Sequence, residues 1–203
     1  MNFPALYGVV LAGGASRRMQ VDKAALSYDG RPQLQRAYEL LSARCERTFV
    51  SLRGDQRDEP TRAAFPQIED LHPGLGPLAG IVAAFTRYPQ VAWLVVACDL
   101  PFLTAATLDQ LIHQRDPQRV ATAFLSSYDA LPEPLCAIWE PRSFVSLQQW
   151  MAAGKQCPRK FLTNSEVALL QQPDTKALDN VNTPDEYRNA ASQLQSAGPQ
   201  RAQ

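Results

Sequence analysis

Short apolar runs alternate along the chain with stretches whose apolar residues recur at helical spacing. The run at 7–11 leads into glycines, and the run at 92–97 is the most continuous apolar stretch in the chain. Such runs are typical of strands buried on both faces of a sheet. Runs of the same kind predict further strands at 48–52, 120–125 and 134–139.

Between these runs, apolar residues return every three or four positions, which predicts amphipathic helices at 34–44, 78–88 and 144–153. Thr104 is suited to cap a further helix, and Thr183 forms a capping box with Glu186 at the start of the last one. Strands that alternate with helices predict an α/β fold: three layers, doubly wound, with a mostly parallel sheet. We expect one domain over 1–191 and a polar, disordered tail over 192–203.

Composition excludes several classes of protein. The 203 residues include 20 Lys plus Arg and 20 Asp plus Glu, so the formal charge is zero, which argues against a nucleic-acid or membrane-surface binder. No apolar run approaches the ~18 residues that cross a bilayer. The four cysteines are widely spaced and lack metal-site motifs, which favours buried free thiols and a cytoplasmic location.

Ligands of such sheets bind beyond the carboxyl ends of the strands, so the residues that follow each strand are candidates for chemistry. After the first strand, Gly13 and Gly14 allow close approach to phosphate oxygens, with Arg17, Arg18 and Lys23 as nearby cations. The segment matches neither the phosphate loop nor the dinucleotide glycine pattern. An ordinary turn with solvated arginines is the alternative explanation.

Three more segments carry candidate groups. Asp99 follows the most apolar strand and can bind a hard cation that bridges phosphates, or simply precede a proline in a turn. Asp70, followed by the glycine-rich stretch 73–78, can accept hydrogen bonds from a base edge or a ribose, although an exposed loop that leads into a helix is the alternative. Alternation places Asn180 and Asn182 on one side of an extended segment, although a plain helix cap is the alternative.

In their order along the chain, these segments resemble the molybdenum cofactor guanylyltransferases, a family of the nucleotidyltransferase superfamily. The motifs that carry the resemblance lie at 11–23, 74–80, 98–101 and 180–184. They cover nearly the whole chain, and their ordered combination is specific although no single motif is. The resemblance implies a Rossmann-like sheet of the nucleotide-diphospho-sugar transferase type.

The resemblance also implies transfer of GMP from GTP to the terminal phosphate of molybdopterin, with Mg²⁺ as cofactor and pyrophosphate as product. Arg17, Lys23 and Asp99 are the expected catalytic residues, and Asp99 is the expected metal ligand. Asn180 and Asn182 are expected to bind the acceptor. The residues expected to bind GTP are Leu11, Ala12, Gly13, Gly14, Lys23, Ser51, Asp70, Gly76, Leu78 and Asp99.

Expected partners are GTP, molybdopterin or the molybdenum cofactor, and a molybdoenzyme or its chaperone; no nucleic acid and no membrane is expected. The chain departs from the family's pattern in two places: Gln20 replaces a usual glycine, and Ser51 and Arg53 stand where family members often have an asparagine. The alternatives are a cytidylyltransferase or sugar-phosphate nucleotidyltransferase of the same fold, a non-catalytic nucleotide-binding module, or a protein–protein adaptor.

Overall fold

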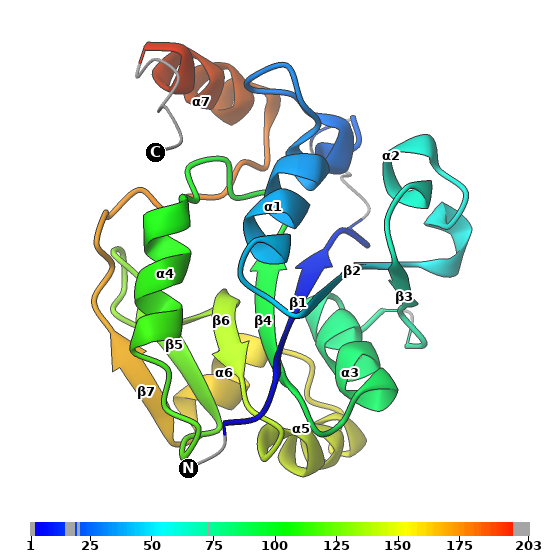
Figure 1. Cartoon of the computed structure of the whole chain (residues 1–203), viewed down its shortest axis with the longest axis vertical. Helices are drawn as coiled ribbons and strands as arrows, with labels where there is room; N and C mark the ends of the chain where they lie inside the picture. Colours follow the sequence, from blue (N-terminus) through cyan, green and yellow to red (C-terminus); the bar gives the residue numbers. More distant parts are fainter. Residues whose placement is uncertain (1–2, 15–18, 20, 73, 197–203) are drawn as a thin grey trace.

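The computed structural model describes residues 3–14, 19, 21–72 and 74–196 of the chain (Figure 1). The strands of this part form one sheet in the order β3-β2-β1-β4-β6-β5-β7. Every neighbouring pair is parallel except the two pairs that involve β6. The strands are β1 (Leu6–Leu11), β2 (Arg47–Leu52), β3 (Gln67–Glu69), β4 (Ala92–Ala97), β5 (Ala121–Leu125), β6 (Pro132–Trp139) and β7 (Val167–Leu170).

Helices cover both faces of this sheet, which makes three layers. The α-helices are α1 (Gln33–Ser42), α2 (Pro60–Ala63), α3 (Pro77–Arg87), α4 (Ala105–His113), α5 (Ser143–Ala152), α6 (Pro158–Thr163) and α7 (Pro184–Ser196). Two short 3₁₀ turns, η1 (Lys23–Ala25) and η2 (Gly54–Gln56), follow β1 and β2. In the described residues, no helix is long and apolar enough to span a bilayer.

Strand periodicity divides the core between the two faces. Val10 packs in one cluster with Leu34 of α1 and Leu108 of α4, whereas the adjacent Val9 packs in a second cluster with Leu78 of α3 and Leu147 of α5. All residues of β4 are buried, as its continuous apolar run predicts. The predicted three-layer, doubly wound α/β fold is confirmed, and α1 and α4 lie on the opposite face from α3 and α5.

The carboxyl ends of β1 and β4 point toward the end of the molecule where α7 lies (Figure 1). The start of α7 has the cap that the sequence predicts. Thr183 Oγ1 accepts the amide of Glu186 at 3.3 Å, and Glu186 Oε2 accepts the amides of Asn182 and Thr183 at 2.6 and 3.1 Å. The predicted capping box is therefore present, and it fixes the segment that precedes α7.

One expectation needs correction, and several features were not predicted. The tail was expected from 192, but α7 continues to Ser196, and residues 197–203 lie outside the described part. The short elements β3, α2, α6 and β7 were not predicted. β6 runs antiparallel because the link at 126–131 is too short for a parallel crossover. The cysteines are free thiols, as expected, although Cys157 is exposed.

Candidate active site

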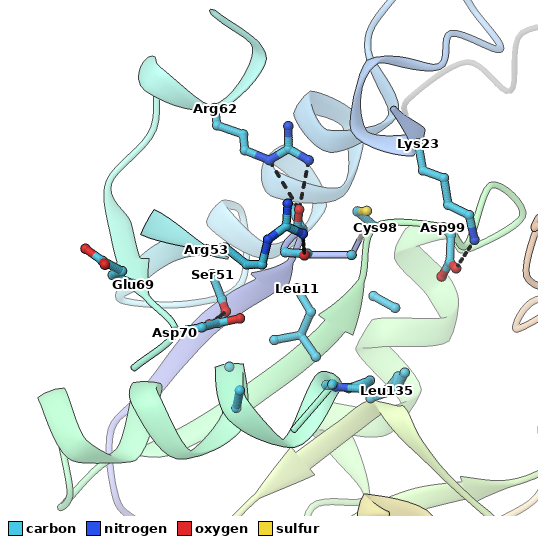
Figure 2. Close-up of a pocket in the computed structure, with 18 of the residues that line it drawn as sticks. Leu11, Lys23, Ser51, Arg53, Arg62, Glu69, Asp70, Cys98, Asp99 and Leu135 are labelled. Atoms are coloured by element: carbon cyan, nitrogen blue, oxygen red, sulfur yellow. Dashed lines mark hydrogen bonds and ion pairs between the residues drawn. The ribbon is translucent and has the colours of Figure 1, made fainter. Parts of the chain in front are cut away.

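A cavity of about 1030 Å³ opens at the carboxyl ends of β1, β2 and β4. This is the edge of the sheet where the sequence predicted a ligand. The predicted site residues that line it come from five segments: Leu11, Ala12, Gly13, Gly14, Lys23, Ser51, Asp70, Gly76, Asp99 and Asn182. Residues separated by most of the chain's length thus face one space (Figure 2).

At one end of the cavity, the ammonium group of Lys23 lies between two oxygen acceptors. Lys23 Nζ lies 2.9 Å from Asp99 Oδ2, and it also donates to Asn182 Oδ1. Asp22 caps the 3₁₀ turn that begins with Lys23, because its Oδ1 accepts the amide of Ala24 at 3.1 Å. Asp99 is the second residue after the end of β4, and Lys23 begins the 3₁₀ turn, so strand and turn together hold this ion pair in place.

The other end of the cavity carries a carboxylate and a hydroxyl. Ser51, the penultimate residue of β2, donates its hydroxyl to Asp70 Oδ1 at 2.5 Å. Burial raises the pKa of Asp70 from 3.8 to about 6, although the Ser51 hydroxyl and the charge of Arg53 act in the opposite direction. Figure 2 shows Ser51 and Asp70 on the opposite side of Leu11 from Lys23 and Asp99.

Two glycines are required for the close packing at this carboxylate end. A Cβ atom on Gly13 would lie 2.9 Å from Asp70 Oδ2, nearer than side chains approach in proteins. A Cβ atom on Gly80 of α3 would collide with Ser51 Oγ and lie 2.7 Å from Leu11 Cδ2. Both glycines therefore allow the loop after β1 and the start of α3 to close around one carboxylate.

Gly76 ends the loop before α3 with a φ of 56°, a conformation that favours glycine. Its place at the cavity agrees with the sequence-based expectation. Leu78 does not: it is fully buried in the core under α3 and does not line the cavity. Leu78 belongs to the apolar face that α3 turns toward the sheet, so its side chain does not face the cavity, and a contact of its backbone with nucleotide stays a prediction.

The structure places Asn180 and Asn182, which precede the last helix, in two different cavities. Asn182 lines the cavity beside Lys23, whereas Asn180 is exposed and lines a second hollow of about 470 Å³. The alternation that placed them together applies to strands, and residues 179–182 form none. Arg17, expected to be catalytic, and Gln20 lie outside the described residues.

The sequence did not indicate two arginines that hold the loop after β1. Arg53 donates to the carbonyl oxygen of Gly13 and pairs with Asp55 at 2.9 Å. Arg62 donates to the carbonyl oxygen of Ala12 at 2.8 Å. Arg53 directly follows β2, so its place near the ligand edge is readable from the sequence, but its bond to the loop is not. Arg62 lies on the four-residue α2, which has no readable periodicity.

The oxygen donors at the lysine end fit a hard divalent cation. Asp99 offers a carboxylate and Asn182 an amide oxygen, and Mg²⁺ is commonly bound by one or two carboxylates together with substrate phosphates. The described residues contain no cluster of three or more His, Cys, Asp or Glu side chains that could hold a metal ion.

A Rossmann-like sheet with a glycine loop and a Lys–Asp pair in one cavity is an arrangement suited to a phosphorylated ligand, as in nucleotidyltransferases. A family model described as the MobA-like NTP transferase domain matches residues 8–171. The chain belongs to this family of nucleotidyltransferases.

Two curated relatives illustrate the relationship. The chain is 32% identical over 197 residues to a molybdenum cofactor guanylyltransferase of Cereibacter sphaeroides, covering 93% of this chain and 97% of that protein. It is 35% identical over 182 residues to a molybdenum cofactor biosynthesis bifunctional protein of Synechocystis, covering 90% of this chain. The chain spans 52% of the length of that bifunctional protein, and 97% of the length of the Cereibacter protein.

Solved structures agree on the fold. Molybdopterin-guanine dinucleotide biosynthesis protein A from Archaeoglobus fulgidus superposes with a TM-score of 0.78 at 24% identity, over 94% of this chain and 99% of that one. A nucleotidyl transferase from Methanothermobacter gives a TM-score of 0.77 at 15% identity, over 96% and 99%. At these identities the likeness establishes the fold alone.

Proposed function

We propose that the chain transfers GMP from GTP to the terminal phosphate of molybdopterin and releases pyrophosphate. The observation that carries this proposal is the chemical difference between the two ends of one cavity. Asp70 offers hydrogen-bond acceptors at one end, Lys23 and Asp99 gather charge at the other, and the loop at 11–14 lies between them (Figure 2). The relatives named as guanylyltransferases support the choice of GTP and of the acceptor.

The base is assigned to the carboxylate end. Guanine presents neighbouring N–H donors along one edge, and an ionised Asp70 can accept both of them. The Ser51 hydroxyl already orients this carboxylate. The absence of a Cβ atom leaves room for Asp70 Oδ2 beside Gly13 and for the Ser51 hydroxyl beside Gly80. The triphosphate then extends along the loop at 11–14 toward Lys23, where glycine amides can donate to phosphate oxygens.

Transfer needs alignment and charge neutralisation. An oxygen of the acceptor's terminal phosphate forms a bond to the α-phosphorus of GTP, while the bond to pyrophosphate breaks and its electron pair leaves with pyrophosphate. A phosphate oxygen is already ionised, so no general base is required. The chain therefore has to hold the two phosphates in line and place Lys23 against the charge that builds up.

Asp99, with the amide oxygen of Asn182, is the proposed holder of Mg²⁺. When bound, the ion would neutralise charge on phosphate oxygens. Arg17 remains a proposed second cation and Asn180 a proposed contact of the acceptor. A molybdoenzyme or its chaperone is the proposed recipient of the product. The free cysteines support the cytoplasm as the compartment.

Thermal unfolding with single nucleotides tests the base assignment. A ligand at a hundred times its Kd raises the free energy of unfolding by about 2.7 kcal/mol, or roughly 5–10 °C in Tm for a chain of this size. GTP with Mg²⁺ should give such a shift, and CTP or UTP at the same concentration should give much less. An increase in Tm with CTP alone would show that the chain binds cytosine and not guanine. No increase with any nucleotide would contradict the proposed function.

A further inference from the structure

One buried arginine joins the two parts of the chain that shape the phosphate end of the cavity. The Arg62 side chain is 1% exposed, and Figure 2 shows its guanidinium facing the backbone beneath it. Nε and Nη2 donate to the carbonyl oxygen of Ala12 at 3.2 and 2.8 Å. Nη1 and Nη2 donate to the Asp22 carboxylate at 2.5 and 3.0 Å, and Nη1 also donates to Glu59. We call these four residues the Arg62 brace.

The guanidinium of Arg62 is fully engaged in this brace. A guanidinium carries five N–H donors, and each has an acceptor among Ala12, Asp22 and Glu59. Two carboxylates also balance its charge. Burial alone would raise the pKa of Asp22, but the hydrogen bonds and charge of Arg62 outweigh it and hold that pKa below 3.8. Arg62 therefore has no donor left for a phosphate.

The brace determines where two phosphate-binding elements lie. On one side it fixes the carbonyl of Ala12, and because the C=O and N–H of a trans peptide point in opposite directions, it also fixes the amide of Gly13. On the other side it fixes Asp22, which caps the turn that carries Lys23. The same guanidinium thus sets the distance between the loop and the lysine that pairs with Asp99.

We infer that Arg62 is a positioning residue for phosphate binding and transfer. Arg62 lines the cavity, but its N–H groups are all engaged by Ala12, Asp22 and Glu59. Its role is to hold the backbone at Ala12 and Gly13 and the turn at Lys23 in the arrangement that a triphosphate requires. This inference rests on the proposed function. A misplacement of about 1 Å in such an arrangement can cost on the order of 100-fold in rate.

The test compares Arg62→Met with a matched control elsewhere in the fold. Arg115 is also buried, at 8% exposure, and pairs with the buried Glu140 at 2.6 Å; neither residue lines the cavity. Steady-state release of pyrophosphate is measured with GTP, Mg²⁺ and molybdopterin. Arg62→Met should raise the KM for GTP and lower kcat, each about 10-fold or more. Arg115→Met should leave both within about twofold per folded molecule.

The change in KM separates positioning from general stability. A purely structural loss would reduce the active fraction, which lowers the apparent kcat of Arg62→Met and leaves the KM for GTP unchanged. That result would overturn the inference. Arg62→Lys keeps the charge but cannot bridge Ala12 and Asp22 in the same way, so it should show the same change in KM to a smaller extent. Arg62→Lys replaces Arg62→Met in this experiment if Arg62→Met does not fold.

A measurement without nucleotide keeps the inference separate from the proposed function. Amide hydrogen exchange of segments 9–14 and 22–26 should be faster in Arg62→Met than in Arg115→Met under conditions of equal global stability. Equal exchange rates in the two variants would overturn the inference that Arg62 positions these segments. If the wild type neither binds nor turns over GTP, the proposed function fails, and the exchange experiment still decides whether Arg62 orders these two segments.

Discussion

The titration of Asp70 gives a prediction whose sign and size follow from its surroundings. Burial raises the pKa of this carboxyl from 3.8 to about 6 in the folded chain. Between these values the unfolded chain has lost its proton while the folded chain still holds it. The unfolded state therefore binds fewer protons, and the free energy of unfolding falls as pH rises through this window.

The magnitude follows from the same two values. Each pKa unit corresponds to about 1.4 kcal/mol, so Asp70 should lower the free energy of unfolding by about 2–3 kcal/mol between about pH 4 and pH 6. Other carboxyls work in the opposite direction, because the pKa values of Asp22, Asp29 and Asp55 are lowered. The quantity to measure is therefore the difference between wild type and Asp70→Asn, which removes only this titration.

Urea unfolding of both proteins at a series of pH values provides the measurement. Relative to Asp70→Asn, the wild type should gain about 2–3 kcal/mol as pH falls from about 7 to about 4. Ser51→Ala removes a hydrogen bond that lowers the pKa of Asp70, so it should move the window to higher pH. A difference that stays constant with pH, or that changes with the opposite sign, would refute the placement of Asp70 in a buried environment.

Three further substitutions give distinct outcomes. Gly80→Ala should destabilise by about 1–3 kcal/mol in urea unfolding, since its Cβ meets Ser51 and Leu11, and adding Ser51→Ala should restore part of the loss; additive effects would contradict this. Glu186→Ala should lower Tm by roughly 2–4 °C because two amides at the start of α7 lose their acceptor, and an unchanged Tm would count against the capping box. Asp99→Asn should abolish transfer with a change of no more than about 1 kcal/mol in the free energy of unfolding, and near-normal turnover would contradict its role.

Elements with a strong local signal were predictable from the sequence. The run at 92–97 became β4 with the same bounds, because six successive apolar residues suit a strand covered on both faces. β3, of three residues, and α2, of four, were missed because they are too short to show a period. The antiparallel direction of β6 depends on a link that the sequence pattern did not single out.

Some residues of the site were likewise predictable from the sequence, and others were not. Glycines, a lysine and a carboxylate that follow strands were readable, because the carboxyl ends of parallel strands meet at one edge. The role of Arg62 was not, since its partners Ala12 and Asp22 lie 50 and 40 positions away. Asn180 and Asn182 were paired by a rule for strands that does not apply to their segment.

The most direct test of the central claim is the mass of the pterin product. After incubation of the chain with Mg²⁺, GTP and molybdopterin, the account predicts a pterin heavier by one GMP unit, together with equimolar pyrophosphate. The same mixture with Asp99→Asn should show neither. An unmodified pterin, under conditions in which a known transferase forms the product, would contradict the claim.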